Sequence, residues 1–292
     1  MPVRGWIGFL NLYGGDFIQY IYDLIEECNQ EGWYLSDPKY VKYWAEDRDF
    51  SKDQLNVLSY GGGTQSTAML ILIFLKKISK PDIVIHSDTG SELPETVEFI
   101  QVAKEFVEKK LKIPFAIVNS HRGSLHEDYY SKGNIPIIGF RSCTSNFKIQ
   151  PQRRLIRKIV GRRNTHLCNC MIGISNDESK RRSESEVKWI KLKFPLLDEF
   201  SYSREECILL NNLYGWNVGK SGCFCCPYQG GKSWLNLKNN HPDLFEFAIK
   251  MEEKKKIVKK GNIGLYQERP LKDLENITLE ESKCDTGAGC FL

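Results

Sequence analysis

The stretch SYGGGTQSTAML places three consecutive glycines, Gly61–Gly63, between an apolar run of strand length and a segment of helical pattern. Glycine tolerates positive φ angles and lets the backbone approach an anion closely. The free N–H groups at the start of a helix face a bound phosphate, and Thr64 and Ser66 add hydroxyl donors. The loop lacks the lysine of a Walker A sequence and does not fit G-x-G-x-x-G. A tight turn without a ligand is therefore the alternative interpretation.

A second stretch, DIVIHSDTGSELPET, places Asp88, Thr89 and Gly90 at the end of a predicted strand and Pro94 at the start of a helical pattern. Ligands of parallel sheets bind at the carboxyl ends of the strands. We therefore expect this turn and the glycine loop to contribute to ligand binding.

The segment from Asn146 to Arg163 carries seven Lys or Arg residues and no acidic residue. Such a local charge attracts phosphate, sulfate or nucleic acid. The alternative is a solvated helix face.

The chain has ten cysteines. In a reducing cytosol, clustered cysteines are more often metal-binding or catalytic than disulfide-bonded. The remaining cysteines, outside the clusters and the C-terminal tail, are interpreted as core residues: Cys28, Cys168, Cys170 and Cys207.

Strand-like runs alternate with helical patterns from about residue 56 onward, at NVLSY, 64–77, DIVIH, 94–110, FAIV, a polar loop, 151–160 and HLCNCMIGI. This alternation predicts an α/β fold, a Rossmann-like parallel sheet with helices on both faces. We expect a helical N-terminal extension over 1–52, a nucleotide-binding domain over 53–232 and a helical, Cys-containing C-terminal extension over 233–292 that includes a Lys-rich helix over 242–260.

No run of about 18 apolar residues occurs in the chain, so no membrane span is expected. The first residues, MPVRGWIGFLNLYGG, lack the basic region and long apolar core of a secretory signal. We expect a cytoplasmic protein.

The glycine loop combined with D-T-G-x-x-x-P-E-T resembles the phosphoadenylyl-sulfate (PAPS) and adenylyl-sulfate (APS) reductases, which belong to the adenine nucleotide α-hydrolase-like (PP-loop) superfamily. The sequence CTSNFKIQP from Cys143 is similar to the family's C-C-x-x-R-K-x-x-P, with Thr144 and Phe147 departing from it. The sequence GISNDES from Gly173 is similar to G-I-R-x-x-E-S, and GCFCC from Gly222 resembles G-C-x-x-C.

This resemblance implies a site for an adenine nucleotide, namely PAPS, APS or ATP. The implied residues are Ser59, Gly61, Gly62, Gly63, Thr64, Gln65, Ser66, Asp88, Thr89, Gly90, Lys148, Gly173, Ser175, Arg181 and Arg182.

Gln65 bears on whether the nucleotide is cleaved. PP-loop pyrophosphatases tend to read S-G-G-x-D-S, whereas the reductases tend to read F-G-A-Q-S. An amide is a much poorer Mg²⁺ ligand than a carboxylate. Gln65 therefore favours an already activated nucleotide, and Mg²⁺ is expected only if ATP is cleaved.

The resemblance also implies a [4Fe–4S] cluster held by Cys143, Cys223 and Cys226, with Cys225 as the nearest candidate for a fourth ligand. Three-cysteine ligation with an open iron is one alternative, and zinc or free thiols are others. In the reductases a C-terminal cysteine attacks the sulfate sulfur. Cys284 and Cys290 are the catalytic candidates here, and an idle tail is the alternative.

The first function hypothesis is thiol-dependent reduction or transfer at sulfur, with a thioredoxin-like or glutathione donor. The second is an ATP-dependent sulfurtransferase that thiolates tRNA or DNA. The third is a non-catalytic nucleotide-binding module of phage or defence origin. A second copy of the chain, forming a homodimer, is a further partner that the sequence leaves open.

Overall fold

The computed structural model of the chain describes residues 17–37, 39–40, 54–138, 140–160, 168–219, 221–258, 264–266 and 270–276. The chain divides into two compact units, each assembled from three separate segments. The sheet unit comprises Met1–Ser87, Glu95–Val118 and Gln150–Ser221. The cysteine unit comprises Asp88–Pro94, Asn119–Ile149 and Gly222–Leu292.

The sheet has six strands in the order β1-β4-β3-β2-β5-β6. Strand β2 runs parallel to β3 and β5, and β5 runs parallel to β6. Strand β1 pairs antiparallel with β4 at the edge. The mostly parallel α/β sheet predicted from the sequence is confirmed. The strand bounds are β1 Tyr34–Leu35, β2 Asn56–Tyr60, β3 Ile83–Asp88, β4 Phe115–Asn119, β5 Cys168–Ile172 and β6 Ile190–Lys193.

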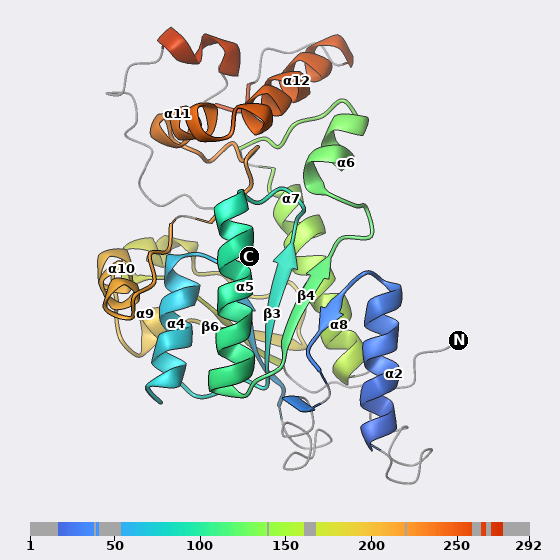
Figure 1. The fold of residues 1–292 in the computed structure, drawn as a ribbon, viewed down its shortest axis with the longest axis vertical. Helices are drawn as coiled ribbons and strands as arrows, with labels where there is room; N and C mark the ends of the chain where they lie inside the picture. Colours follow the sequence, from blue (N-terminus) through green and yellow to red (C-terminus); the bar gives the residue numbers. More distant parts are fainter. Residues whose placement is uncertain are drawn as a thin grey trace. The chain divides into compact units, whose positions relative to one another are not determined.

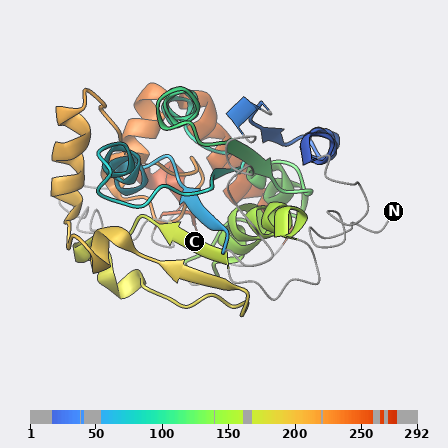
Figure 2. The same ribbon diagram turned by 90° about the horizontal axis from the view of Figure 1, so that it is seen from below.

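Helices cover both faces of the sheet (Figures 1 and 2). The crossovers through α4 (Thr64–Phe74) and α5 (Pro94–Phe106) both step toward the β1 edge, and the crossover through α8 (Gln150–Val160) steps back across the sheet from β4 to β5. Right-handed connections in opposite directions place their helices on opposite faces. Figure 2 accordingly shows α4 and α5 on one side and α8 on the other.

Helix α4 is buried along almost its whole length, from Thr64 to Ile73. A helix that is apolar all round must be covered on all sides. Its covers include α10 (Arg204–Leu213), which begins with a capping box between Ser203 and Glu206. The helix ends at Phe74, three residues before the predicted Lys77, because Lys76 adopts a left-handed conformation with φ of 57°.

Two sequence expectations for secondary structure were incomplete. The N-terminal region contains helix α2 (Phe17–Gln30), as predicted, but also the edge strand β1. The polar loop expected between β4 and α8 contains helices α6 (Leu125–Ser131) and α7 (Ser142–Thr144) and the π-helical turn η2 (Ser145–Ile149). A second π-helical turn, η1 (Val107–Leu111), continues α5.

The cysteine unit has its own apolar core, which includes Phe147, Phe224 and Trp234. Helices α11 (Gly231–Asn240) and α12 (Pro242–Val258) pack against each other within it. The buried carboxylate of Glu252 on α12 accepts the backbone N–H groups of Leu265 and Leu271 at 2.5 and 2.8 Å. Leu265 and the first residue of the short helix η4 (Leu271–Asn276) are thereby fixed to α12.

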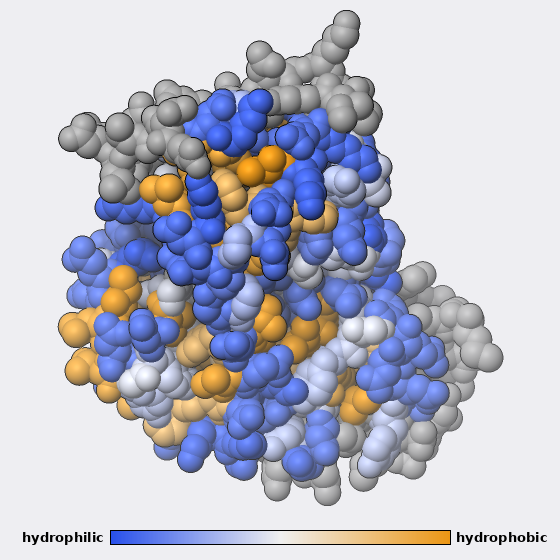
Figure 3. Space-filling model, turned by 45° about the horizontal axis from the view of Figure 1, so that its top comes forward, coloured by the Kyte–Doolittle hydropathy of each residue, from blue (hydrophilic) through white to orange (hydrophobic). Residues whose placement is uncertain are grey.

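Within the described ranges, no helix combines the length and the apolar character that crossing a bilayer requires. On the face shown in Figure 3, hydrophilic side chains predominate and hydrophobic areas are interspersed among them.

The short edge strand β1 is held by a buried carboxylate, and this arrangement generates a prediction. Tyr34 and Ser36 each donate a hydrogen bond to Glu108 Oε1 at 2.6 Å. We expect Glu108→Ala to lower the free energy of unfolding by about 1–3 kcal/mol, because Tyr34 loses the acceptor of its hydroxyl and Ser36 keeps only the Phe115 carbonyl at 3.0 Å. Glu105→Ala removes an exposed carboxylate that pairs with Lys109, and we expect it to cost much less than Glu108→Ala, because solvent screens an exposed pair. Urea unfolding of both variants measures the difference, and equal costs would show that Glu108 does not anchor β1.

Candidate functional site

The glycine loop connects β2 to α4 as predicted. Gly62 has a φ of 72°, which favours glycine, and Gly63 is the N-cap of α4 without any side-chain cap. The first N–H groups of α4 are therefore not capped by a neighbouring side chain of the loop. The Ser66 hydroxyl donates to the Gly63 carbonyl at 3.1 Å and so stabilises the turn itself.

The Gln65 side chain is used inside the protein. Its amide donates to the Ser175 hydroxyl at 3.3 Å and to the Glu178 carboxylate at 3.2 Å. Both acceptors follow β5, and Glu178 lies in the 3₁₀ helix η3 (Asn176–Arg181). The amide thus connects the start of α4 to the loop after β5.

Both arginines that the sequence assigned to the anion make ion pairs. Arg181 donates to Glu178 at 2.6 Å, and Arg182 donates to Asp198 in the short helix α9 (Pro195–Asp198) at 2.7 Å. Burial raises the pKa of the Glu178 carboxyl, and the Arg181 charge partly opposes that shift. Glu178 was not assigned as a site residue from the sequence, although it lies within the GISNDES motif.

Gly173 lets two backbones approach each other. A Cβ at this position would lie 2.8 Å from the Ser66 nitrogen and 3.0 Å from the Gln65 carbonyl carbon. These neighbours are main-chain atoms, so a side chain could be accepted only if the start of α4 moved.

The turn Asp88–Gly90 belongs to the cysteine unit. The Asp88 carboxylate accepts the Gly90 N–H at 2.7 Å, and Gly90 has a φ of 65°. The Thr89 hydroxyl lies 3.2 Å from Cys223 Sγ. The same hydroxyl accepts the Ser91 N–H at 3.3 Å, so its own hydrogen is available to the sulfur. The structure therefore places Thr89 in contact with a thiol.

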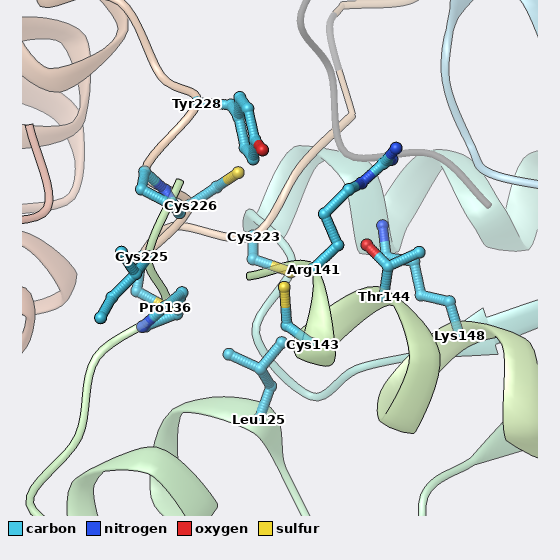
Figure 4. A pocket seen from close by; sticks show the side chains of 12 residues that line it. Leu125, Pro136, Arg141, Cys143, Thr144, Lys148, Cys223, Cys225, Cys226 and Tyr228 are labelled. Carbon is cyan, nitrogen blue, oxygen red and sulfur yellow. The ribbon is translucent and has the colours of Figure 1, made fainter. Parts of the chain in front are cut away.

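Three of the predicted metal-ligand cysteines point into one pocket of the cysteine unit. Figure 4 shows the thiols of Cys143, Cys223 and Cys226 directed toward the middle of the pocket, whereas Cys225 lies at its edge beside Pro136. Thr144, which stands where the family motif has a second cysteine, also lines the pocket.

Two cations complete this pocket. Lys148 was expected from the sequence, and Arg141 was missed because it precedes the CTSNFK motif. A pocket that combines thiols with a guanidinium and an ammonium group attracts anions.

The donors in the pocket are cysteine thiols, which iron–sulfur groups and zinc both use. The described residues include no cluster of three or more His, Cys, Asp or Glu side chains that could enclose one metal ion. An iron–sulfur cluster takes one thiolate on each of several separate irons. The thiols of Cys143, Cys223 and Cys226 are three of the four thiolates that a [4Fe–4S] cluster usually takes.

The remaining described cysteines lie in buried surroundings that disfavour the reactive thiolate form. Burial raises the pKa of Cys28, Cys170 and Cys207 to about 12, and it raises the pKa of Cys168 as well. These thiols are core residues, as the sequence predicted. Cys284 and Cys290 lie outside the described residues.

The cations of α8 are largely used within the protein. Arg154 pairs with Glu31, and Lys158 pairs with Glu27 and Glu31. Glu27 lies on α2, and Glu31 directly follows that helix. Arg153 pairs with Glu186, and the Arg157 guanidinium lies 3.8 Å from the centre of the Trp189 ring. These contacts therefore involve the same positive charges that the sequence predicted to attract an anionic partner. Arg162 and Arg163 lie outside the described residues.

Comparison with known proteins gives one family and a few relatives. The family described as the phosphoadenosine phosphosulfate reductase domain matches residues 55–229. Two uncharacterized proteins of Methanocaldococcus jannaschii are similar: one is 26% identical over 201 residues, covering 64% of this chain and 45% of the relative. The other is 25% identical over 203 residues, covering 65% and 40%. The chain thus spans less than half the length of these curated relatives.

Among solved structures, the U34-tRNA thiolase NcsA from Methanococcus maripaludis with its [4Fe-4S] cluster is similar to this chain with a TM-score of 0.41 and 18% identity. The similarity covers 90% of each of the two chains.

The contact between Gly173 and Ser66 generates a prediction. We expect Gly173→Ala to lower the free energy of unfolding by about 1–3 kcal/mol, because the added methyl group forces a backbone shift. Gly219→Ala is the matched control, since a Cβ at Gly219 meets no atom within 4 Å. Urea unfolding measures both variants, and a neutral Gly173→Ala would mean that the start of α4 adapts freely.

Proposed function

The chain belongs to the phosphoadenosine phosphosulfate reductase domain family, and on this premise we propose that it is an enzyme that binds an adenine nucleotide and carries out thiol-dependent reduction or transfer at sulfur. The observation that carries the proposal is the pocket in which Cys143, Cys223 and Cys226 lie together with Arg141 and Lys148. Thiols supply nucleophilic sulfur or metal ligands, and the two cations attract an anionic substrate.

The glycine loop and the first turn of α4 hold the phosphate or sulfate end of the nucleotide in this proposal. Their role is to offer uncapped backbone N–H groups in a fixed position. Gly62 supplies the turn, and Gly173 allows the loop after β5 to lie against the start of α4.

Cys143, Cys223 and Cys226 would hold a [4Fe–4S] cluster. Three protein thiolates leave one iron without a protein ligand, so a bound cluster would supply a site at which an external sulfur can bind. The Thr89 hydroxyl, 3.2 Å from Cys223 Sγ, would orient the Cys223 thiolate.

The reductive reaction needs two thiols. One thiolate attacks the sulfur of the adenylated sulfate, so that a sulfur–sulfur bond forms and the bond from sulfur to the phosphate oxygen breaks. The nucleotide leaves with that oxygen. A second thiol then attacks the protein sulfur, releases sulfite and forms a disulfide, so that two thiols are oxidised for each sulfate reduced. Cys284 or Cys290 is the proposed nucleophile, and a thioredoxin-like protein or glutathione is the proposed donor.

An ATP-dependent sulfurtransferase that thiolates tRNA or DNA is the second candidate. Thr144 in the place of a second cysteine favours it, because only three of the four cysteines that line the pocket point toward its middle. The ion pairs of the α8 cations oppose it, since they occupy charges that a nucleic acid would require.

The test starts from protein purified without oxygen and assayed for iron and acid-labile sulfide. We expect sulfite release from PAPS or APS in the presence of thioredoxin or glutathione. Cys223→Ser should lower the rate by about a hundredfold or more, because the pocket loses one of its three inward thiols. Cys207→Ala, which alters a buried core thiol of the sheet unit, should keep the rate within about twofold.

Conversion of ATP to AMP without any sulfite would contradict the reductase proposal and favour the sulfurtransferase. Binding of nucleotide without turnover of either substrate would contradict both.

A further inference from the structure

Two side chains donate hydrogen bonds to the Glu178 carboxylate near the start of α4. Arg181 Nη1 lies 2.6 Å from it and Gln65 Nε2 lies 3.2 Å from it. Glu178 is 7% exposed and Gln65 is 5% exposed, so both side chains are shielded from solvent. Gln65 is the second residue of α4, and the carboxylate is therefore held against the first turn of that helix.

This geometry has an electrostatic consequence. The first turn of a helix carries a partial positive charge that favours anions. The negative charge of Glu178 opposes this partial positive charge. It also offsets the positive charge of Arg181, which would otherwise add to it. Because Coulomb repulsion grows with the charge of the ligand, a buried carboxylate penalises a highly charged anion more than a weakly charged one.

We infer that Glu178 is a specificity-determining residue, which makes the loop at the start of α4 prefer an anion of low charge, such as a sulfate or a single phosphate ester, over a polyphosphate. The inference rests on the proposed function only in taking this loop as the anion-binding element. Glu178 acts through Gln65 and Arg181 and needs no contact with the anion.

The neighbouring pair Arg182–Asp198 provides a matched control. Its ion-pair distance of 2.7 Å is similar, but its side chains are 57% and 40% exposed. Solvent and salt screen an exposed charge far more than a buried one. Removing the Asp198 charge should therefore affect anion preference much less than removing the Glu178 charge.

The experiment is calorimetric titration of the full chain with two probes, inorganic sulfate and inorganic tripolyphosphate. It is done at pH 8, because burial raises the pKa of Glu178 and the carboxylate must be ionised. We expect Glu178→Gln to strengthen tripolyphosphate binding by about tenfold and sulfate binding by no more than about threefold. Asp198→Asn should change both by less than about twofold.

Equal changes for the two probes in Glu178→Gln, or the same shift in Asp198→Asn, would overturn the inference. If Glu178→Gln does not fold, Arg181→Gln tests the pair from its other side. That variant leaves the carboxylate unbalanced and should weaken tripolyphosphate binding more than sulfate binding, and an equal loss would again overturn the inference.

The outcomes separate this inference from the proposed function. Sulfite release with an unchanged probe preference in Glu178→Gln contradicts the inference alone. The expected preference without sulfite release contradicts the proposed function alone. Failure of the wild-type chain to bind either probe contradicts both.

Discussion

The contact between the loop after β5 and the first turn of α4 is the constraint on which the sheet unit depends. Gly173 lies so close to the Ser66 nitrogen that no side chain fits between them. The hydrogen bonds from Gln65 to Ser175 and Glu178 hold the same two segments together. Strands β2 and β5 are neighbours in the sheet, and their carboxyl ends are thereby fixed in one arrangement before any ligand arrives. A loop that is ordered in advance loses less entropy when it binds.

The sequence predicted the parts of the fold that depend on local pattern. The runs NVLSY, DIVIH and FAIV became β2, β3 and β4, because a short apolar run between turn residues suits a buried strand. Strands β1 and β6 were missed because they are two and four residues long and lie at the edges, where burial imposes little pattern. The glycine loop was identified, since glycine at a strand-to-helix turn has a local cause.

The partners of the site residues could not be read from the sequence in the same way. Gln65 and Glu178 are 113 residues apart and Thr89 and Cys223 are 134 apart, and no local pattern encodes either pairing. Arg154 and Lys158 of α8 appeared available to an anionic partner because their partners Glu27 and Glu31 lie more than a hundred residues earlier. A run of basic residues predicts an anion-binding surface only when the acidic residues that pair with it in the fold are also known.

Each unit thus carries one part of the proposed chemistry. The sheet unit offers a loop whose polar side chains satisfy one another, and the cysteine unit offers thiols with two cations. Calorimetric binding of adenylyl sulfate and of ATP, each with Mg²⁺ and with a chelator, tests most directly whether the loop takes an already activated nucleotide without a metal ion. We expect adenylyl sulfate to bind with the same affinity, within about twofold, whether or not Mg²⁺ is present, because Gln65 offers no carboxylate to the cation. If ATP binds only with Mg²⁺ and adenylyl sulfate does not bind at all, the loop does not take an activated nucleotide in this way.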